Sequence, residues 1–540
     1  MDKRTFIALF VVVILFFVWS TYFGPKPQPA TTAQTADSLA ADTTKTPAAI
    51  QTPAALPDSL LMGADSLKTL TLANANFTVR FSNRGASITS IELKKFSWSD
   101  KTTPVDLVPE DKDLAGIALL QHKAAAPRDL KTVTWHSAQS DTAGIVFWLG
   151  EESAPLVRKS YRLDDKYGIL LDVTVNSPDP VYGIEYDFSA GIADSEVIKP
   201  RAKDQDYKVL LFADNVPVKL TLPKIRKEAP PSAVSSFKWA ALRSKYFSIA
   251  ILETGNPLTS NYHPGISKET GNPSLILDSR DATPSQNWAQ SFLIYAGPAD
   301  HDLMKSYPET KLELIPDRGP GWLRWLANAI AWLLKFLHSF IPNYGIVIII
   351  FSFILKLVLH PLTKKSMDAN LKMQRIQPQM QEIQTKYKSD PQKMQQEVAK
   401  LYKEAGTNPM SGCLPLLLQM PIFIALYNVL RYAMEMRNVS FLGLNLSEPD
   451  PWILPAIMAV FMVLQSLMTR PSKESLAKMD EKQQAMQQST RMMTWIMPVM
   501  LFFIFRGLPS GLVLYYTVFN ILSVAHQYYT QKRLKLKETT

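Results

Sequence analysis

Six apolar runs constrain this chain more than any other feature of its sequence. They lie at residues 6–23, 344–362, 410–431, 451–469, 491–506 and 510–529. A helix of about 20 apolar residues crosses the ~30 Å hydrocarbon core of a bilayer, and a shorter run such as the fifth can thin it locally. We therefore predict a polytopic α-helical membrane protein with six transmembrane helices.

The basic residues favour one orientation of these helices. Residues 363–405 carry nine Lys or Arg against five Asp or Glu, and both the 470–490 loop and the tail after residue 530 are also basic. Lys and Arg gather on the cytoplasmic side of inner-membrane proteins. Six helices with a cytoplasmic N-terminus place all three segments in the cytoplasm, so both chain termini are predicted to be cytoplasmic.

The first apolar run, within residues 1–23, is predicted to be an uncleaved N-terminal transmembrane anchor. The alternative is a cleaved signal peptide, whose apolar region covers only about 7–15 residues and ends in small residues. This run is longer and ends in Trp19, Tyr22 and Phe23. Because aromatic side chains of this kind favour the membrane interface, an anchor fits better.

The middle of the chain, residues 65–318, has the pattern of an all-β domain. Short alternating runs such as FTVRFS and SITSIEL are separated by turn residues, here Asn83-Arg84-Gly85. The domain follows residues 24–64, a segment rich in Pro, Ala and Thr that is predicted to be a disordered linker. We predict a β-sandwich, which is periplasmic if the first helix is oriented as above.

Two helical segments are predicted to lie outside the bilayer core. In residues 322–340 the polar side chains share one helical face and tryptophans add interfacial anchors, so this helix is predicted to lie along the membrane surface. Residues 363–405 hold two arms with apolar residues at helical spacing, separated by Ser389-Asp390-Pro391. This pattern predicts a cytoplasmic helical hairpin.

No enzyme motif is recognisable in the sequence. It has no P-loop, no Gly-rich nucleotide turn, no nucleophile elbow and no His/Cys metal-ligand spacing. The single cysteine, Cys413, excludes a disulfide within the chain. We therefore expect a protein that is not an enzyme, with no catalytic residue, no metal and no cofactor.

One charge lies where a membrane helix rarely carries one. Lys356 stands inside IVIIIFSFILKLVLHPLTKK, residues 346–365, and a lysine at the bilayer centre costs about 2.5–3.5 kcal/mol. None of the six runs holds a central Asp or Glu that would neutralise it. Two interpretations stay open. The ammonium either extends along the helix to the cytoplasmic interface or lines a wetted groove open to the cytoplasm.

Other polar residues in the apolar runs could line such a groove. Ser352 precedes Lys356 by one helical turn, and further candidates are Gln419, Asn428, Gln465, Tyr516 and Asn520. Each alone is more often a hydrogen-bond partner between helices. Seventeen of the twenty methionines lie between Met367 and Met500. Such flexible side chains suit a surface that meets many different apolar segments.

Three stretches of the chain resemble the YidC family of bacterial membrane-protein insertases. They are FILKLVLHPLTKKSM (353–367), NPMSGCLPLLLQMPIFIALYNVL (408–430) and FRGLPSGLVLYYTVFN (505–520). A large periplasmic sandwich between the first two membrane helices is typical of the Gram-negative members. The resemblance implies an insertase core at residues 319–533, built from five of the six helices, followed by a short basic tail at 534–540.

The resemblance also implies a function and a site. Family members insert newly made proteins into the bacterial inner membrane and help them fold, alone or with the Sec translocon. A basic groove residue falls at Lys356, where most members have arginine, with substrate contacts at Gln419, Met420 and Phe423 and a groove-side tyrosine at Tyr516. Implied partners are nascent membrane proteins, the Sec translocon, the ribosome, the signal-recognition-particle receptor and the lipid bilayer.

Two other functions stay open on the sequence alone. A transporter or channel would need a path through the membrane and often shows internal repeats, and none is visible between the two halves of the membrane region. A membrane-anchored periplasmic carbohydrate-binding protein would use its sandwich domain, but a sandwich fold alone does not establish that activity.

Overall fold

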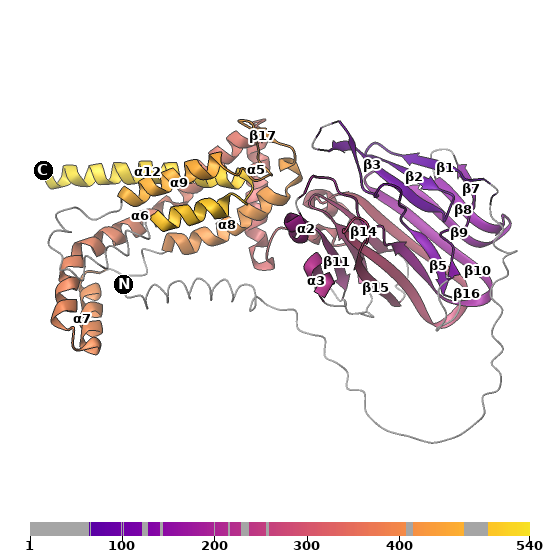
Figure 1. Ribbon diagram of the computed structural model, residues 1–540, viewed down its shortest axis with the longest axis horizontal. Coiled ribbons are helices and arrows are strands. Elements are labelled where there is room, and N and C mark those ends of the chain that lie inside the picture. The colour runs from indigo at the N-terminus through magenta and orange to yellow at the C-terminus, as the bar shows by residue number, and fades with distance from the viewer. Residues whose placement is uncertain are drawn as a thin grey trace, which may run out of the picture. The chain divides into compact units, whose positions relative to one another are not determined.

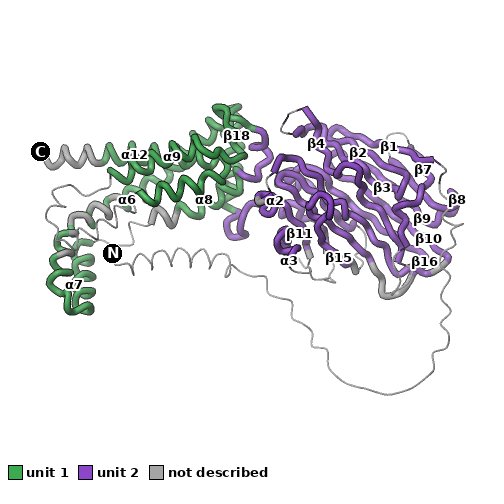
Figure 2. The backbone as a smooth tube through the Cα atoms, in the orientation of Figure 1, with its two compact units in different colours: residues 1–52, 325–430, 439–540 green, residues 53–324, 431–438 purple. Residues whose placement is uncertain are grey.

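The computed structural model describes residues 64, 66–98, 100, 102–120, 128–140, 144–198, 200–213, 216–227, 237–254, 259–406, 414–468 and 495–539. The predicted anchor at 1–23, nearly all of the linker at 24–64 and the 470–490 loop lie outside these residues. Figure 2 shows two compact units. We call Pro53–Arg324 with Arg431–Asn438 the β unit, and the unit that holds Trp325–Leu430 and Val439–Thr540 the helical unit.

The β unit begins with a small antiparallel sheet of order β1-β2-β3-β4. Its strands are β1 (Thr69–Ala73), β2 (Phe77–Ser82), β3 (Ser87–Ser97) and β4 (Pro104–Asp106). Side chains alternate between the two faces of a strand, and in β2 this buries Phe77, Val79 and Phe81 completely. The alternation read from FTVRFS therefore describes this strand correctly.

A second, larger sheet has twelve strands, nine of them in the order β12-β11-β13-β14-β16-β10-β9-β8-β7. In chain order its strands are β5 (Gly116–Leu120), β6 (Arg128–Asp129), β7 (His136–Ser140), β8 (Gly144–Glu151), β9 (Ala154–Leu163), β10 (Gly168–Phe188), β11 (Lys208–Ala213), β12 (Val216–Thr221), β13 (Phe237–Arg243), β14 (Phe247–Glu253), β15 (Thr259–Ile266) and β16 (Pro273–Pro298). The two longest strands, β10 and β16, pair antiparallel along most of their length (Figure 1).

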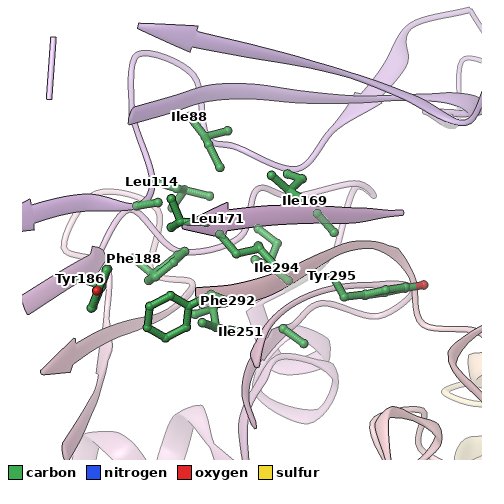
Figure 3. Close-up of a cluster of buried hydrophobic side chains, with 14 of the residues drawn as sticks. Ile88, Leu114, Ile169, Leu171, Tyr186, Phe188, Ile251, Phe292, Ile294 and Tyr295 are labelled. Carbon is green, nitrogen blue, oxygen red and sulfur yellow. The ribbon is translucent and has the colours of Figure 1, made fainter. Parts of the chain in front are cut away.

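Apolar side chains from both sheets form one core. Figure 3 shows Ile88 and Leu114 gathered with Ile169, Leu171 and Ile294. Each of these side chains is at most 1% exposed, and burying one such side chain stabilises the fold by about 1.5–3 kcal/mol. The predicted β-sandwich is confirmed. Three short α-helices also belong to the described part of the unit: α2 (Pro200–Asp206), α3 (Leu222–Lys227) and α4 (His301–Lys305), besides 3-10 turns at Leu312–Leu314, Gly321–Leu323 and Met434–Met436.

The β unit also contains Arg431–Asn438, a segment that the sequence did not assign to it. Arg431 Nε and Nη2 donate to the two carboxylate oxygens of Asp206 at 3.0 and 3.1 Å. The side chains of both residues are nearly inaccessible, at 8% and 1% exposed. Arg437 Nε donates to a carboxylate oxygen of Glu196, and its Nη2 donates to the Ser195 carbonyl oxygen at 3.3 Å. Moving the segment would leave a buried charge without its partner, which is energetically costly. The two ion pairs therefore hold the segment in one position.

The helical unit is built from long helices. They are α5 (Arg324–His338), α6 (Tyr344–Lys386), α7 (Pro391–Glu404), α8 (Leu414–Tyr432, which ends in the β unit), α9 (Ile453–Met468), Trp495–Phe505 and α12 (Ser510–Thr539). Helix α12 packs against both α6 and α9 (Figure 1). On α5 the small or aliphatic residues Ala327, Ala331 and Leu334 are buried, whereas Trp325 and Trp332 are exposed.

Two helices are longer than the sequence predicted. We expected a span at 344–362 followed by a separate hairpin at 363–405, yet α6 runs without a break from Tyr344 to Lys386 through Pro361 and Pro378. A proline removes one backbone hydrogen bond, and the helix continues past both prolines all the same. Helix α12 likewise continues past residue 529 to Thr539.

Within the described residues, one helix has both the length and the apolar composition to cross a membrane, Tyr344–Ser366. Two more apolar helices, Ile453–Met468 and Trp495–Phe505, are shorter. The count of six spans stays a prediction. The second half of α6 and α7 pack together, and Tyr402 Oη donates to Met380 Sδ at 3.1 Å.

Candidate functional site

Lys356 is held between two helices of the helical unit. Its Nζ donates to Ser523 Oγ of α12 at 2.7 Å and lies 4.4 Å from the centroid of the Phe519 ring. The Ser523 hydroxyl in turn donates to the Phe519 carbonyl oxygen at 2.7 Å. The lysine stem therefore crosses from α6 to α12, and its ammonium is bound there by a neutral hydroxyl and a ring face.

No carboxylate lies within ion-pair distance of Lys356 among the residues that the structure describes. The sequence had already suggested this, because none of the six runs carries a central acid. An ammonium has three N–H donors, and Ser523 takes one of them. The remaining donors can bind water or the carboxylate of another chain.

Ser352 does not contribute to this contact. It is fully buried, and its Oγ donates to the Ile348 carbonyl oxygen of its own helix at 2.7 Å. Its hydrogen bond is therefore used locally, one turn away from Lys356. The structure thus joins Lys356 to Ser523 and Phe519 rather than to Ser352.

Gln419 forms a second polar link, between α8 and α12. Its Nε2 donates to Tyr515 Oη at 2.7 Å, and the Tyr515 ring is buried beside Phe351 of α6, with 6.0 Å between ring centroids. The contact brings three helices together at one level. Tyr515 was not a sequence candidate, although it stands next to Tyr516, which was.

Phe423 and Tyr516, two sequence candidates, do meet in the structure. Their ring centroids lie 6.2 Å apart in a T-shaped arrangement. Phe505 completes an aromatic cluster, with its centroid 5.0 Å from Tyr516 and 5.8 Å from Phe423. Met420, three residues before Phe423 on α8, is half-buried. Phe423, Tyr516, Phe505 and Met420 thus form an apolar and aromatic surface in the middle of α8, with Gln419 as its polar neighbour.

Sequence reasoning missed Ser523 and Phe519. A signal was present, because Ser523 is a small hydroxyl residue in an apolar run, three positions after Asn520, and such residues often bond across helices. The described residues contain no group of three or more His, Cys, Asp or Glu that could hold a metal ion.

Together these features define a class of protein: a helical membrane protein with a charge held between its helices and a large β domain. Residues 336–538 match the family model described as 60Kd inner membrane protein. Residues 69–333 match the model described as YidC periplasmic domain. The chain belongs to the YidC family of membrane protein insertases.

Individual relatives support this family assignment. The chain is 30% identical to the membrane protein insertase YidC of Geobacter metallireducens over 100% of both chains. It is 29% identical to the YidC of Pelodictyon phaeoclathratiforme, covering 98% of this chain and 95% of the relative. A solved structure, described as an active YidC insertase crystal structure with the first transmembrane domain resolved, aligns with a TM-score of 0.37 and 20% identity over 86% of this chain and 93% of that one.

The family match confirms the insertase prediction, which the transporter and carbohydrate-binding alternatives had left open. It also confirms a periplasmic domain and a location in the bacterial inner membrane. Membrane protein insertases are not a class of enzymes.

Proposed function

We propose that Lys356 is the charge of a hydrophilic groove that is open to the cytoplasm and to lipid, through which this chain inserts new membrane proteins. The observation that supports the proposal is the bond from Lys356 Nζ to the neutral Ser523 Oγ, with no carboxylate beside it in the described part of the chain. A charge inside a membrane needs water or an opposite charge. A groove supplies water at rest, and an acidic segment of a substrate supplies the charge during insertion.

The apolar part of the substrate follows a different surface. Gln419, Met420 and Phe423 lie on α8, and the Phe423 ring adjoins Tyr516. We propose that a substrate's hydrophobic segment slides past these residues into lipid while its acidic segment is drawn toward Lys356. The step requires no nucleotide, because moving apolar surface out of water is itself favourable.

The topology that goes with this function has six membrane spans, cytoplasmic termini, a periplasmic β unit and the hairpin of α6 and α7 in the cytoplasm. The basic charge of residues 363–405 supports that side for the hairpin. Proposed partners are nascent membrane proteins and the Sec translocon. The ribosome and the signal-recognition-particle receptor would deliver substrates to the cytoplasmic side.

Depletion of the protein tests the proposal directly. Small single-span membrane proteins should accumulate uninserted, and the wild-type chain should restore them. A matched pair of variants sharpens the test: Lys356→Glu should fail to restore acidic substrates, whereas Lys364→Glu, two turns further along the same helix, should succeed. Normal insertion in depleted cells would contradict the proposal.

A further inference from the structure

Arg506 lies against a group of aromatic rings at one end of the helical unit. It directly follows the helix Trp495–Phe505, and its guanidinium carbon is 4.1 Å from the centroid of the Trp452 ring. Phe502 and Phe503 stand at 6.0 and 5.9 Å from the same atom. A guanidinium this close to an indole face is held by cation–π attraction, and a stacked arginine keeps its N–H edge available.

That edge has no acceptor among the residues that the structure describes. The nearest acid in sequence to Trp452, Asp450, is buried and accepts hydrogen bonds from the backbone N–H groups of Trp452, Ile453 and Leu454. Its carboxylate therefore caps α9 and does not neutralise Arg506. A guanidinium carries five N–H donors whose fork matches a phosphate or a carboxylate.

The surface around Arg506 is apolar and open. Trp452 is 59% exposed and Phe503 61%. Ile453, at the start of α9, is similarly exposed. In a protein of the inner membrane such a surface faces lipid, and tryptophan favours the depth of the lipid headgroups. The surface thus offers apolar contact beside a cation at the depth where phosphates lie.

Contacts of the neighbouring segments place Arg506 and its aromatic neighbours at the end of the helical unit where α6 begins. Residue Ser510 donates its backbone N–H to the Glu448 carbonyl oxygen at 2.8 Å, which ties the loop before α9 to the start of α12. A side chain added at Gly511 would meet Leu446 and Ile348, and Ile348 belongs to the first turns of α6. This end is opposite to the basic hairpin, so it faces the periplasm in the topology proposed above.

We propose that Arg506 and Trp452 bind the phosphate of an anionic phospholipid headgroup in the periplasmic leaflet. The guanidinium edge holds two phosphate oxygens, the indole supports the guanidinium from one face, and the acyl chains run along Phe503 and Ile453. An anionic headgroup such as phosphatidylglycerol is preferred, because it brings no ammonium group next to the arginine. The proposal rests on the membrane location and on the topology proposed above, and not on the role of Lys356.

The test uses the full-length chain purified in a neutral detergent, with phosphatidylglycerol added in steps. Bound lipid is counted by native mass spectrometry, and lipid-induced thermal stabilisation is measured in parallel. The variants are Arg506→Gln, Arg506→Lys and Trp452→Leu, and Lys365→Gln serves as a control cation at the other end of the protein. We expect Arg506→Gln to bind the lipid about fivefold more weakly, as loss of one interfacial arginine implies. Arg506→Lys and Trp452→Leu should show smaller losses and the control none.

Several outcomes would overturn the proposal. One is phosphatidylglycerol binding by Arg506→Gln that equals the wild type. Another is equal stabilisation by inorganic phosphate at the same phosphate concentration, which would indicate a site for free anions. Equal binding of phosphatidylcholine would remove the preference for anionic lipid. If Arg506→Gln did not fold, Arg506→Lys and Trp452→Leu would decide by the same counts. Insertion activity is not a readout, so failure here leaves the Lys356 proposal untouched.

Discussion

Replacing Lys356 tests whether its charge attracts substrates. The Nζ is held at 2.7 Å from Ser523 Oγ, and we take about 4 Å as the separation between its charge and an entering carboxylate. Two unit charges at that distance attract by about 1 kcal/mol in bulk water and by about 4 kcal/mol at an effective dielectric constant of 20. Lys356 is half-buried, and in the proposed wetted groove its interaction energy would lie between these limits. We take about 2 kcal/mol, which changes occupancy by about 30-fold.

From this energy we expect a fixed order among the Lys356 variants in how well they insert an acidic substrate. Lys356→Arg keeps the charge and should insert an acidic substrate nearly as well as the wild type. Lys356→Ala removes the attraction and should lower insertion of the same substrate by up to about 30-fold. Lys356→Glu replaces attraction by repulsion and should fall lower still. A substrate whose translocated segment has no acidic residue should change by less than about twofold in all three variants.

The assay measures insertion into proteoliposomes at matched protein levels. The substrate is a single-span protein whose translocated segment carries zero, one, two or three acidic residues, and Lys364→Glu is the matched control variant. Higher salt should flatten the series, although less than it would at an exposed site. An identical loss in all Lys356 variants, independent of substrate charge, would refute the electrostatic reasoning and favour a purely structural lysine.

Three further predictions follow from other parts of the molecule. Deleting 366–403 and joining the ends with a short flexible linker should leave the spans assembled and block insertion; normal insertion at normal protein levels would make the hairpin a mere connector. Asp206→Asn breaks the buried pair with Arg431 and should lower the free energy of unfolding of the β unit by about 3–5 kcal/mol, with partial recovery in the double variant Asp206→Asn/Arg431→Met. Burial lowers the pKa of the Lys159 ammonium to about 7, so between about pH 7 and 10 the unfolded chain holds a proton that the folded chain lacks. Stability against heat should therefore rise with pH in this window more steeply for the wild type than for Lys159→Met, and equal slopes would contradict the assignment.

The β unit shows what sequence patterns can and cannot reveal. Burial of Phe77, Val79 and Phe81 follows from alternation within one strand, a local property. The position of β16 between β14 and β10 depends on pairing of residues far apart in the chain, for which no short pattern exists. Membership of Arg431–Asn438 in this unit was hidden for the same reason, since its partner Asp206 lies 225 residues earlier.

The candidate site likewise has one part that the sequence predicts and another that it does not. Lys356 could be found because a charge in an apolar run is costly wherever the helices pack. Its pairing with Ser523 could not be predicted, because a hydroxyl in an apolar run indicates a bond between helices but not which residue it meets, and this depends on the packing of α6 on α12. Gln419 gives a second example of a contact that the sequence does not predict. Its partner is Tyr515 and not Tyr516, and neighbouring residues on a helix point about 100° apart. The sequence offers two adjacent tyrosines and does not state which one binds Gln419, since the other packs on Phe423 of the same helix.

In the proposed groove, the Lys356 ammonium would have to leave its resting partner and bind a substrate carboxylate. A hydroxyl partner such as Ser523 suits that exchange better than a carboxylate would. A buried ion pair costs about 3–5 kcal/mol to break from one side, so a built-in carboxylate would hold the ammonium against every substrate. A hydrogen bond from a charged group to a hydroxyl contributes only about 1.5–3 kcal/mol, and an incoming carboxylate can replace it. The Ser523 hydroxyl also donates to the Phe519 carbonyl oxygen, so it keeps a partner when the ammonium moves. In the groove proposed above, the charge would thus be held in place at rest and could still be neutralised by an acidic segment of a substrate.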